Sequence, residues 1–191
     1  MHYPKKCSDL FVKGLFTCRL GVKMEVTCGN NKYSVDDIVQ KYTDMLYRVA
    51  VMKMKNVPDA EEVVQETFLR LIKQIKIGKK FESEEHLKSW LLRVEINHGN
   101  TILSSIWNNR THGMDDINES GYEDDYDFGS AYDYVLKLPE KYRIAIQLHY
   151  YEELKTEEIA KIMKTKPATV RSYLKRGRDK LKELTWLIFL C

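Results

Sequence analysis

The stretch from Thr156 to Leu184, TEEIAKIMKTKPATVRSYLKRGRDKLKEL, predicts two short helices joined by a tight turn. Thr156 suits the N-cap of the first helix, and Glu157 and Glu158 follow in its first turn, where the helix dipole favours carboxylates. Pro167 suits the first turn of the second helix, because proline lacks the N–H that this turn leaves unpaired. Two helices in this arrangement form a helix-turn-helix pattern.

The second of these helices combines an apolar stripe with a basic one. At about 100° per residue, one narrow stripe that must face a core contains Val170, Leu174, Gly177 and Leu181. A second stripe, about a quarter turn away, contains Arg171, Lys175, Arg178 and Lys182. Such a helix fits the major groove of DNA, although the same cations on an ordinary surface helix would simply be solvated. The tight turn and the short helix before it favour DNA.

Length, charge and cysteine content narrow the class of protein to which the chain can belong. Its 191 residues suffice for one or two domains, and the net charge of +3 is modest, so the basicity near the C-terminus is balanced elsewhere. The cysteines at positions 7, 18, 28 and 191 lie outside the predicted core and match no zinc spacing, which indicates a reduced, cytoplasmic protein. The sequence shows no glycine-rich phosphate loop and no nucleophile paired with a base. We therefore expect no enzyme, no cofactor and no metal.

Amphipathic segments elsewhere predict an all-α fold of two small helical domains. A helix after Ser34, a second that begins at Asp59 with Glu62 as its capping partner, and a third from Ser83 form a bundle over residues 34–104. Trp90 falls on the buried stripe of the third helix, which Gly99 weakens near its end.

The helix-turn-helix domain covers residues 131–184 and includes short helices at 132–138 and from Pro139 onward. Residues 105–130 form an acidic flexible linker, since seven acids and no Lys or Arg occur between Thr111 and Ser130. Residues 1–33 are a weakly ordered extension without a signal peptide, in which Met24 is an alternative start. Residues 185–191 form an apolar tail that packs on the last domain or serves as an interaction patch; eight residues from Leu184 are too few for a membrane span of about 20.

Four segments in this order resemble a known family. They are DAEEVVQETFLRLIK (59–73), WLLRVEIN (90–97), LPEKYRIAIQLHYYEELKTEEIA (138–160) and ATVRSYLKRGRDKL (168–181). Together they resemble a bacterial RNA polymerase sigma factor of the small extracytoplasmic-function (ECF) type, which keeps only regions 2 and 4. The resemblance runs from about Ser34 to Leu184 and preserves order and spacing across two domains.

The resemblance implies a role for each domain in transcription initiation. Region 2 would dock on the clamp helices of the polymerase beta-prime subunit through Asp59, Glu62, Gln65, Glu66, Leu69 and Arg70. It would melt the minus-ten promoter element with Lys88, Arg93 and Asn97, the last lining a pocket for a flipped base. Region 4 would bind the beta flap and read the minus-thirty-five element with Thr169, Arg171, Ser172, Lys175, Arg176 and Arg178. An anti-sigma factor would be a further partner, and no small-molecule substrate is implied.

The sequence departs from the family pattern in two places. Residues 98–103 are HGNTIL, where the family commonly has acidic and basic residues, and Pro167-Ala168 stand where the family often has glycine. The acidic linker would follow the path of the transcript, with disordered solubility as an alternative reading of its charge. The alternative function is a stand-alone helix-turn-helix regulator with an effector domain at the front. The front domain favours polymerase, because no cluster of inward polar residues predicts an effector pocket.

Overall fold

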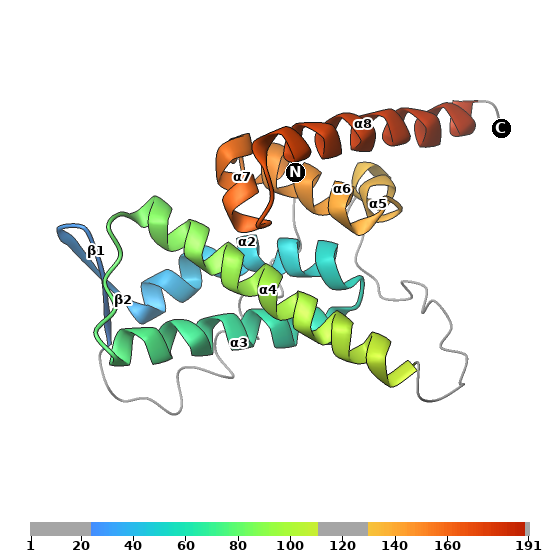
Figure 1. The fold of residues 1–191 in the computed structure, drawn as a ribbon. Helices are drawn as coiled ribbons and strands as arrows, with labels where there is room; N and C mark the ends of the chain where they lie inside the picture. Colours follow the sequence, from blue (N-terminus) through green and yellow to red (C-terminus); the bar gives the residue numbers. More distant parts are fainter. Residues whose placement is uncertain (1–23, 111–129, 190–191) are drawn as a thin grey trace.

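The computed structural model describes residues 24–110 and 130–189 and forms two layers of helices (Figure 1). The N-terminal module consists of β1 (Glu25–Cys28), β2 (Asn31–Ser34), α2 (Val35–Met54), α3 (Val57–Lys76) and α4 (Glu84–Arg110). The C-terminal module consists of α5 (Ser130–Leu136), α6 (Glu140–Ile146), the π-helical turn η1 (Gln147–Tyr151), α7 (Thr156–Ile162) and α8 (Pro167–Phe189). The all-α prediction is thus confirmed, apart from one small β-hairpin.

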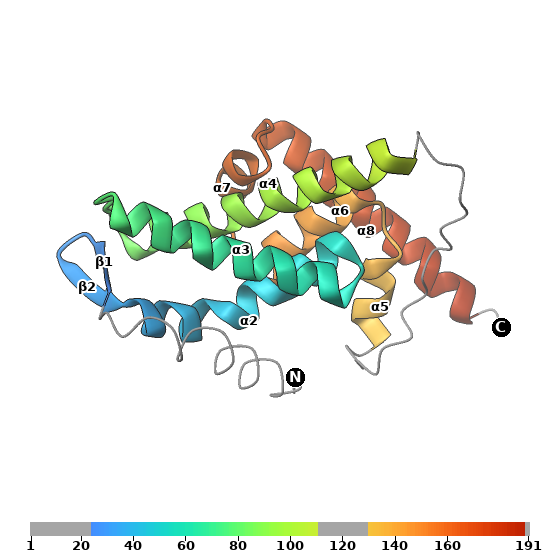
Figure 2. The same cartoon turned by 90° about the horizontal axis from the view of Figure 1, so that it is seen from below.

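The N-terminal module is a bundle in which α2, α3 and α4 all contact one another (Figure 2). Its apolar positions recur at helical spacing, and Leu46, Phe68 and Leu91 are almost fully buried. Ser34 caps α2, since its side chain accepts a hydrogen bond from the Asp37 N–H at 3.1 Å, and the Asp37 carboxylate accepts one from the Ser34 N–H at 3.3 Å. The predicted start of the first helix is therefore confirmed.

Two predicted helix starts are wrong by a few residues. Helix α3 begins at Val57, not at Asp59, because Asn56 is the N-cap and accepts from the Asp59 N–H at 3.2 Å. Pro58 lies in the first turn, where its missing N–H costs nothing. Thr156 is the first helical residue of α7 and not its cap; the chain enters through Lys155, whose N–H donates to the Glu158 carboxylate at 2.8 Å.

Helix α4 continues through Arg110, so the predicted module end at residue 104 falls inside it. Hydroxyls in the polar run that suggested a linker bond to carbonyls of the preceding turn, as Ser104 does to Asn100 at 2.8 Å, so they are satisfied within the helix. Ile102 and Leu103 also pack partly against the core. Most of the predicted linker lies outside the described residues. Helix α8 likewise continues through Phe189, so the backbone of residues 185–189 is helical.

The β-hairpin corrects the prediction that residues 24–33 are weakly ordered. Val26 and Cys28 are buried, and Gly29, with φ of 59°, forms the turn between the strands. Phe81 pairs with β1 on its other side, donating from its N–H to the Thr27 carbonyl at 2.9 Å. Cys28 therefore belongs to the core, contrary to the expectation for the cysteines. The rest of the predicted extension lies outside the described residues.

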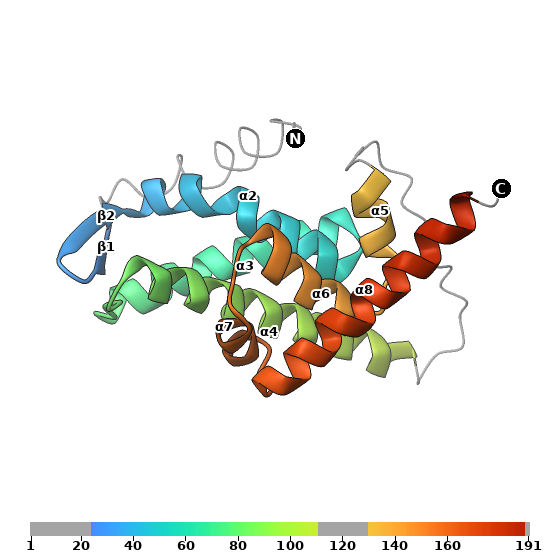
Figure 3. The same cartoon turned by 90° about the horizontal axis from the view of Figure 1, so that it is seen from above.

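The two modules pack against each other in Figure 3, where α6 and α7 lie over α2 and α4. Arg143 of α6, only 3% exposed, donates to the carbonyls of Met52 and Lys53 at the end of α2. The same guanidinium binds Leu136 and Leu138 carbonyls at 3.2 and 2.8 Å. Carbonyls at a helix end have no partner within the helix, so Arg143 completes the C-terminus of α2 from the other module.

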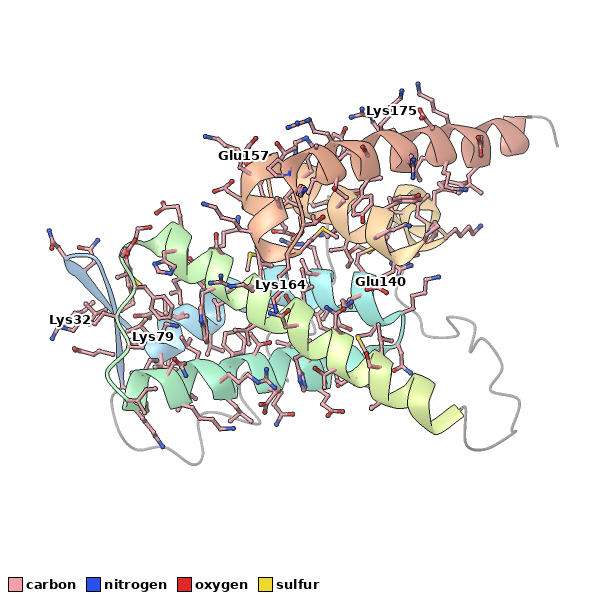
Figure 4. All side chains as sticks on the ribbon, in the orientation of Figure 1. Lys32, Lys79, Glu140, Glu157, Lys164 and Lys175 are labelled. Carbon is pink, nitrogen blue, oxygen red and sulfur yellow. The ribbon has the colours of Figure 1, made fainter. Side chains whose placement is uncertain are left out.

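A second contact between the modules depends on a glycine. Lys53 is buried; it pairs with Glu140 of α6 and donates to the Asn100 side chain at 2.6 Å. A Cβ at Gly99 would lie 2.9 Å from Cε of Lys53, so the absent side chain makes room for the lysine to cross α4. Figure 4 places Glu140 at this contact between the layers. No helix in the described ranges has both the length and the apolar character that a membrane span needs.

Candidate nucleic-acid interface

Helix α8 divides into a buried and an exposed face, as its periodicity predicts. Val170 and Leu174 are buried, and a Cβ at Gly177 would lie 2.7 Å from Cδ1 of Ile146, so α8 approaches α6 closely at this point. The exposed side contains Arg171, Ser172, Lys175, Arg176 and Arg178, with Thr169 half-buried at its edge. Lys175 points away from the rest of the molecule in Figure 4.

The turn between α7 and α8 is tight and partly strained. Met163 is the C-cap of α7, Lys164 follows with φ of 52°, and the Thr165 N–H donates to the Ala160 carbonyl at 2.9 Å. A left-handed residue at this place is the usual way to end a helix, although glycine is the residue that adopts it without cost. The turn directs α8 across α7, with Ile159 and Ala160 buried beneath it.

Tyr150 of η1 extends the basic face of α8. Its ring is 50% exposed, and its hydroxyl accepts a hydrogen bond from Arg178 at 2.9 Å. The five residues of η1 are wound as a π-helix, a rare form that is often found at functional sites. Helical periodicity gives no signal for Tyr150, because a π-helical turn shifts the register on which that periodicity depends.

The residues expected to contact the minus-ten element lie on α4, and two of them face the C-terminal module. Lys88 donates to the backbone carbonyl of Glu152 at 3.0 Å. Arg93 lines a hollow between α4 and α7 together with Glu158 and Lys161. Asn97 is half-buried at the side of α4. Trp90 is 8% exposed and belongs to the core, which confirms its predicted place.

Glu152 joins the modules at this surface. Its carboxylate accepts two hydrogen bonds from Arg48 of α2, both at 3.2 Å, and a third from Nε2 of Gln147 at 3.0 Å. The glutamate is 6% exposed, so the ion pair is largely shielded from water. Two parallel hydrogen bonds between arginine and a carboxylate fix direction as well as distance. Lys88 of α4, which donates to the Glu152 carbonyl, therefore lies beside a contact between the modules that the Arg48–Glu152 ion pair holds in place.

The candidate docking residues line one side of α3. Their spacing of three and four residues places them on a common face, of which Glu62 and Leu69 are the most exposed parts. Glu66 accepts from Nε of Arg70 at 2.9 Å, and this hydrogen bond holds the pKa of Glu66 below its usual value. The remaining members of the set, Asp59 and Gln65, are half-buried.

His98 connects this surface to α4 and was not predicted as a contact. Its Nδ1 lies 3.2 Å from Nη2 of Arg70, and because arginine can only donate, Nδ1 must accept and the neutral ring carries its proton on Nε2. Burial, and then the charge of Arg70, lower the pKa of His98. Its position at helical spacing from Leu91 and Val94, on the stripe that packs against α3, was the available signal.

These features define the class of protein: a helical DNA-binding protein with a helix-turn-helix at its C-terminal end. Comparison with protein families matches residues 38–98 to sigma-70 region 2 and residues 129–181 to sigma-70 region 4. The chain belongs to the sigma factors of bacterial RNA polymerase, in the ECF class. The family expected from the sequence is thereby confirmed.

Named relatives agree with this assignment. The chain is 27% identical over 169 residues to the ECF RNA polymerase sigma factor SigW of Bacillus subtilis, covering 77% of this chain and 86% of the relative. It is 30% identical over 163 residues to the ECF sigma factor SigE of Mycolicibacterium smegmatis, covering 78% of this chain and 61% of that longer relative.

Two solved structures share the fold. The sigma factor RpoE of Bartonella quintana, solved with the anti-sigma factor NepR, superimposes with a TM-score of 0.62 at 21% identity, covering 78% of this chain and 96% of that one. CnrH, solved with the cytosolic domain of CnrY, has a TM-score of 0.54 at 17% identity, covering 79% of this chain and 86% of that one.

Proposed function

We propose that the protein is a sigma subunit that joins core RNA polymerase and directs it to promoters, with α3 docking on the polymerase clamp, α4 melting the minus-ten element and α8 reading the minus-thirty-five element. It contributes binding and strand separation and no chemical step of its own. It acts in the cytoplasm, where polymerase and chromosome lie. An anti-sigma factor is a further partner in this proposal, as in the complexes of its structural relatives.

One observation supports the proposal beyond family membership: the exposed side of α8 is rich in basic side chains whose chemistry suits DNA. Arg171 and Lys175 project into solvent one turn apart, while Val170 and Leu174 hold the helix to the module. A guanidinium can make two hydrogen bonds to guanine in the major groove, and an ammonium group attracts phosphate. A stand-alone regulator would share this face, but it would not need the docking surface on α3.

Transcription with purified core polymerase tests the division of labour. Arg171→Ala removes a contact of about 1–3 kcal/mol, so we expect at least about a fivefold loss of initiation from promoters with an intact minus-thirty-five element. Lys180→Ala is the matched control, because Lys180 is exposed on the same helix but points to the side opposite Arg171. This variant should change initiation less than twofold. Equal losses in the two variants would contradict the placement of α8.

Polymerase docking and promoter melting are separable in the same system. Replacing Gln65 and Glu66 together with alanine should weaken co-purification with core polymerase, because the α3 surface loses an amide and a carboxylate. Asn97→Ala should leave co-purification intact and reduce open-complex formation, measured by permanganate reactivity of unpaired thymines. If the α3 double variant binds polymerase as the wild type does, α3 is not the docking helix.

A further inference from the structure

Glu95 is an unusual buried residue on the face of α4 that the C-terminal module covers, because it follows Lys88 by seven residues, or about two helical turns, and Lys88 donates to the Glu152 carbonyl. It lies on α4, is 1% exposed, and neither of its carboxylate oxygens has a hydrogen-bond partner among the described residues. An ionised carboxylate in such a place is costly, because burial removes its hydration and nothing replaces it. A buried acid without a partner is therefore stable only if its carboxyl group is protonated, or if the protein has a second arrangement of its modules in which the carboxylate is exposed to water.

The charges around Glu95 come from both modules. The carboxylate of Glu152, the residue directly after η1, adds a negative charge near Glu95, and this carboxylate is already bound by Arg48 of α2 and by Gln147. On α4 itself Lys88 is bound to the Glu152 backbone, and α7 presents Glu158 and Lys161 to the neighbouring part of α4. Burial, and secondarily the charge of Glu152, raise the pKa of Glu95 well above its ordinary value. The second module thus adds negative charge beside Glu95 and leaves it no cation.

The proposed function requires the two modules to separate, and the inference rests on that function. A compact chain of this length has a radius of gyration of about 16 Å and thus a diameter of about 40 Å. The minus-ten and minus-thirty-five elements are about 25 base pairs apart, or about 85 Å at about 3.4 Å per base pair. The packed arrangement, in which α6 and α7 contact α2 and α4, cannot reach both elements at once.

We propose that Glu95 is a proton-linked latch, protonated while the C-terminal module covers α4 and ionised in water when that module leaves. The packed form then holds one proton more than the open form. Each unit fall in pH raises the ratio of packed to open protein by up to tenfold, between the raised pKa of the packed form and the ordinary glutamate pKa of about 4.3. The packed form is favoured by acid and is lost as pH rises through this window.

The test measures how often Lys88 is uncovered in the free, full-length protein. Brief acylation followed by mass spectrometry gives the labelling of Lys88 relative to that of exposed Lys180, which corrects for the effect of pH on amine reactivity. X-ray scattering at each pH reports the radius of gyration independently. Neither polymerase nor DNA is present, so a failure of transcription and a failure of the latch remain distinguishable.

In the wild type we expect the Lys88:Lys180 ratio and the radius of gyration to fall as the pH is lowered from 8 to 5, the ratio by up to tenfold per pH unit once the pH is below the raised pKa of Glu95. Glu95→Gln should stay packed at both pH values, because its side chain is neutral throughout. Glu157→Gln removes an exposed acid from α7 and should respond to pH as the wild type does. Glu95→Met has a similar volume and replaces the glutamine variant if that fails to fold, as judged by circular dichroism.

Two results would overturn the latch. In one, the neutral variants at position 95 keep the pH response of the wild type; in the other, the wild type shows no response and the neutral variants match it. Either would mean that Glu95 does not change its protonation when the modules separate.

Discussion

The cations of α8 and of α4 belong to the same proposed promoter interface but differ in what surrounds them. Arg171 and Lys175 of α8 lie in solvent, whereas Lys88 is bound to Glu152 and Arg93 faces α7. Residue type is the same on both helices. The difference shows that availability for DNA is decided by packing between modules, so this arrangement presents one half of the interface and covers the other.

The largest expected effect comes from the residue that joins the modules. Arg143→Met keeps most of the side-chain volume but leaves buried carbonyls of Met52 and Leu138 without a donor, at about 1–3 kcal/mol each. We expect the free energy of unfolding, measured with urea, to fall by about 3 kcal/mol or more. Acylation of Lys88 should rise while that of Lys175 stays unchanged.

Lys141→Met is the matched control for that variant. Lys141 is exposed on the same helix and makes cation–π contacts with Tyr142 and Tyr173, which are worth about 0.5–1 kcal/mol at an exposed site. Comparable losses of stability in the two variants would mean that Arg143 does not hold the modules together.

An effect of intermediate size tests how α8, the exposed half of the proposed promoter interface, is packed against α6. Gly177→Ala would improve helix propensity by about 1 kcal/mol, but its Cβ meets Ile146 at 2.7 Å, and overpacking typically costs about 1–3 kcal/mol. We expect a net loss of about 1 kcal/mol in urea unfolding and weaker binding to minus-thirty-five duplexes. Lys180→Ala should change stability by less than about 0.5 kcal/mol. A more stable Gly177→Ala would show that α8 does not depend on close approach to α6.

The smallest effect is a gain. Lys164→Gly should stabilise the protein by about 0.5–1 kcal/mol, because a left-handed conformation costs a side-chain-bearing residue about 1–2 kcal/mol and glycine gives back part of this in the unfolded state. Lys161→Gly, within α7, should instead destabilise by about 1 kcal/mol. Thermal unfolding distinguishes the two signs, and a loss in both variants would show that the turn is not strained.

Local periodicity was enough to predict the helices and the two faces of α8. Val170 and Leu174 are buried where a repeat of 3.6 residues places them, and Arg171 and Lys175 are exposed for the same reason. The family resemblance came from such segments in a fixed order. The residue roles at polymerase and promoter stay predictions, because they concern partners outside the chain.

Helical periodicity does not predict contacts between residues that are far apart in the sequence. Arg48 and Glu152 are separated by 104 positions, and neither occupies a place that helical spacing marks as special. The β-hairpin was missed because four-residue strands with only Val26 and Cys28 buried give too short an alternation. Glu95 could have been noticed, since it stands one turn after Leu91 on a buried stripe, where a charged residue contradicts the pattern.

The missing side chain at position 99 also constrains how this protein can diverge. Because Lys53 occupies the space that a Cβ would take, a larger residue at 99 is tolerated only if the lysine is shortened or withdrawn, and Glu140 then loses its counter-ion. Positions 53, 99 and 140 should accordingly be inherited as a set. In a library randomised at all three, we expect survivors to carry either the glycine with both charges or a bulkier residue with neither.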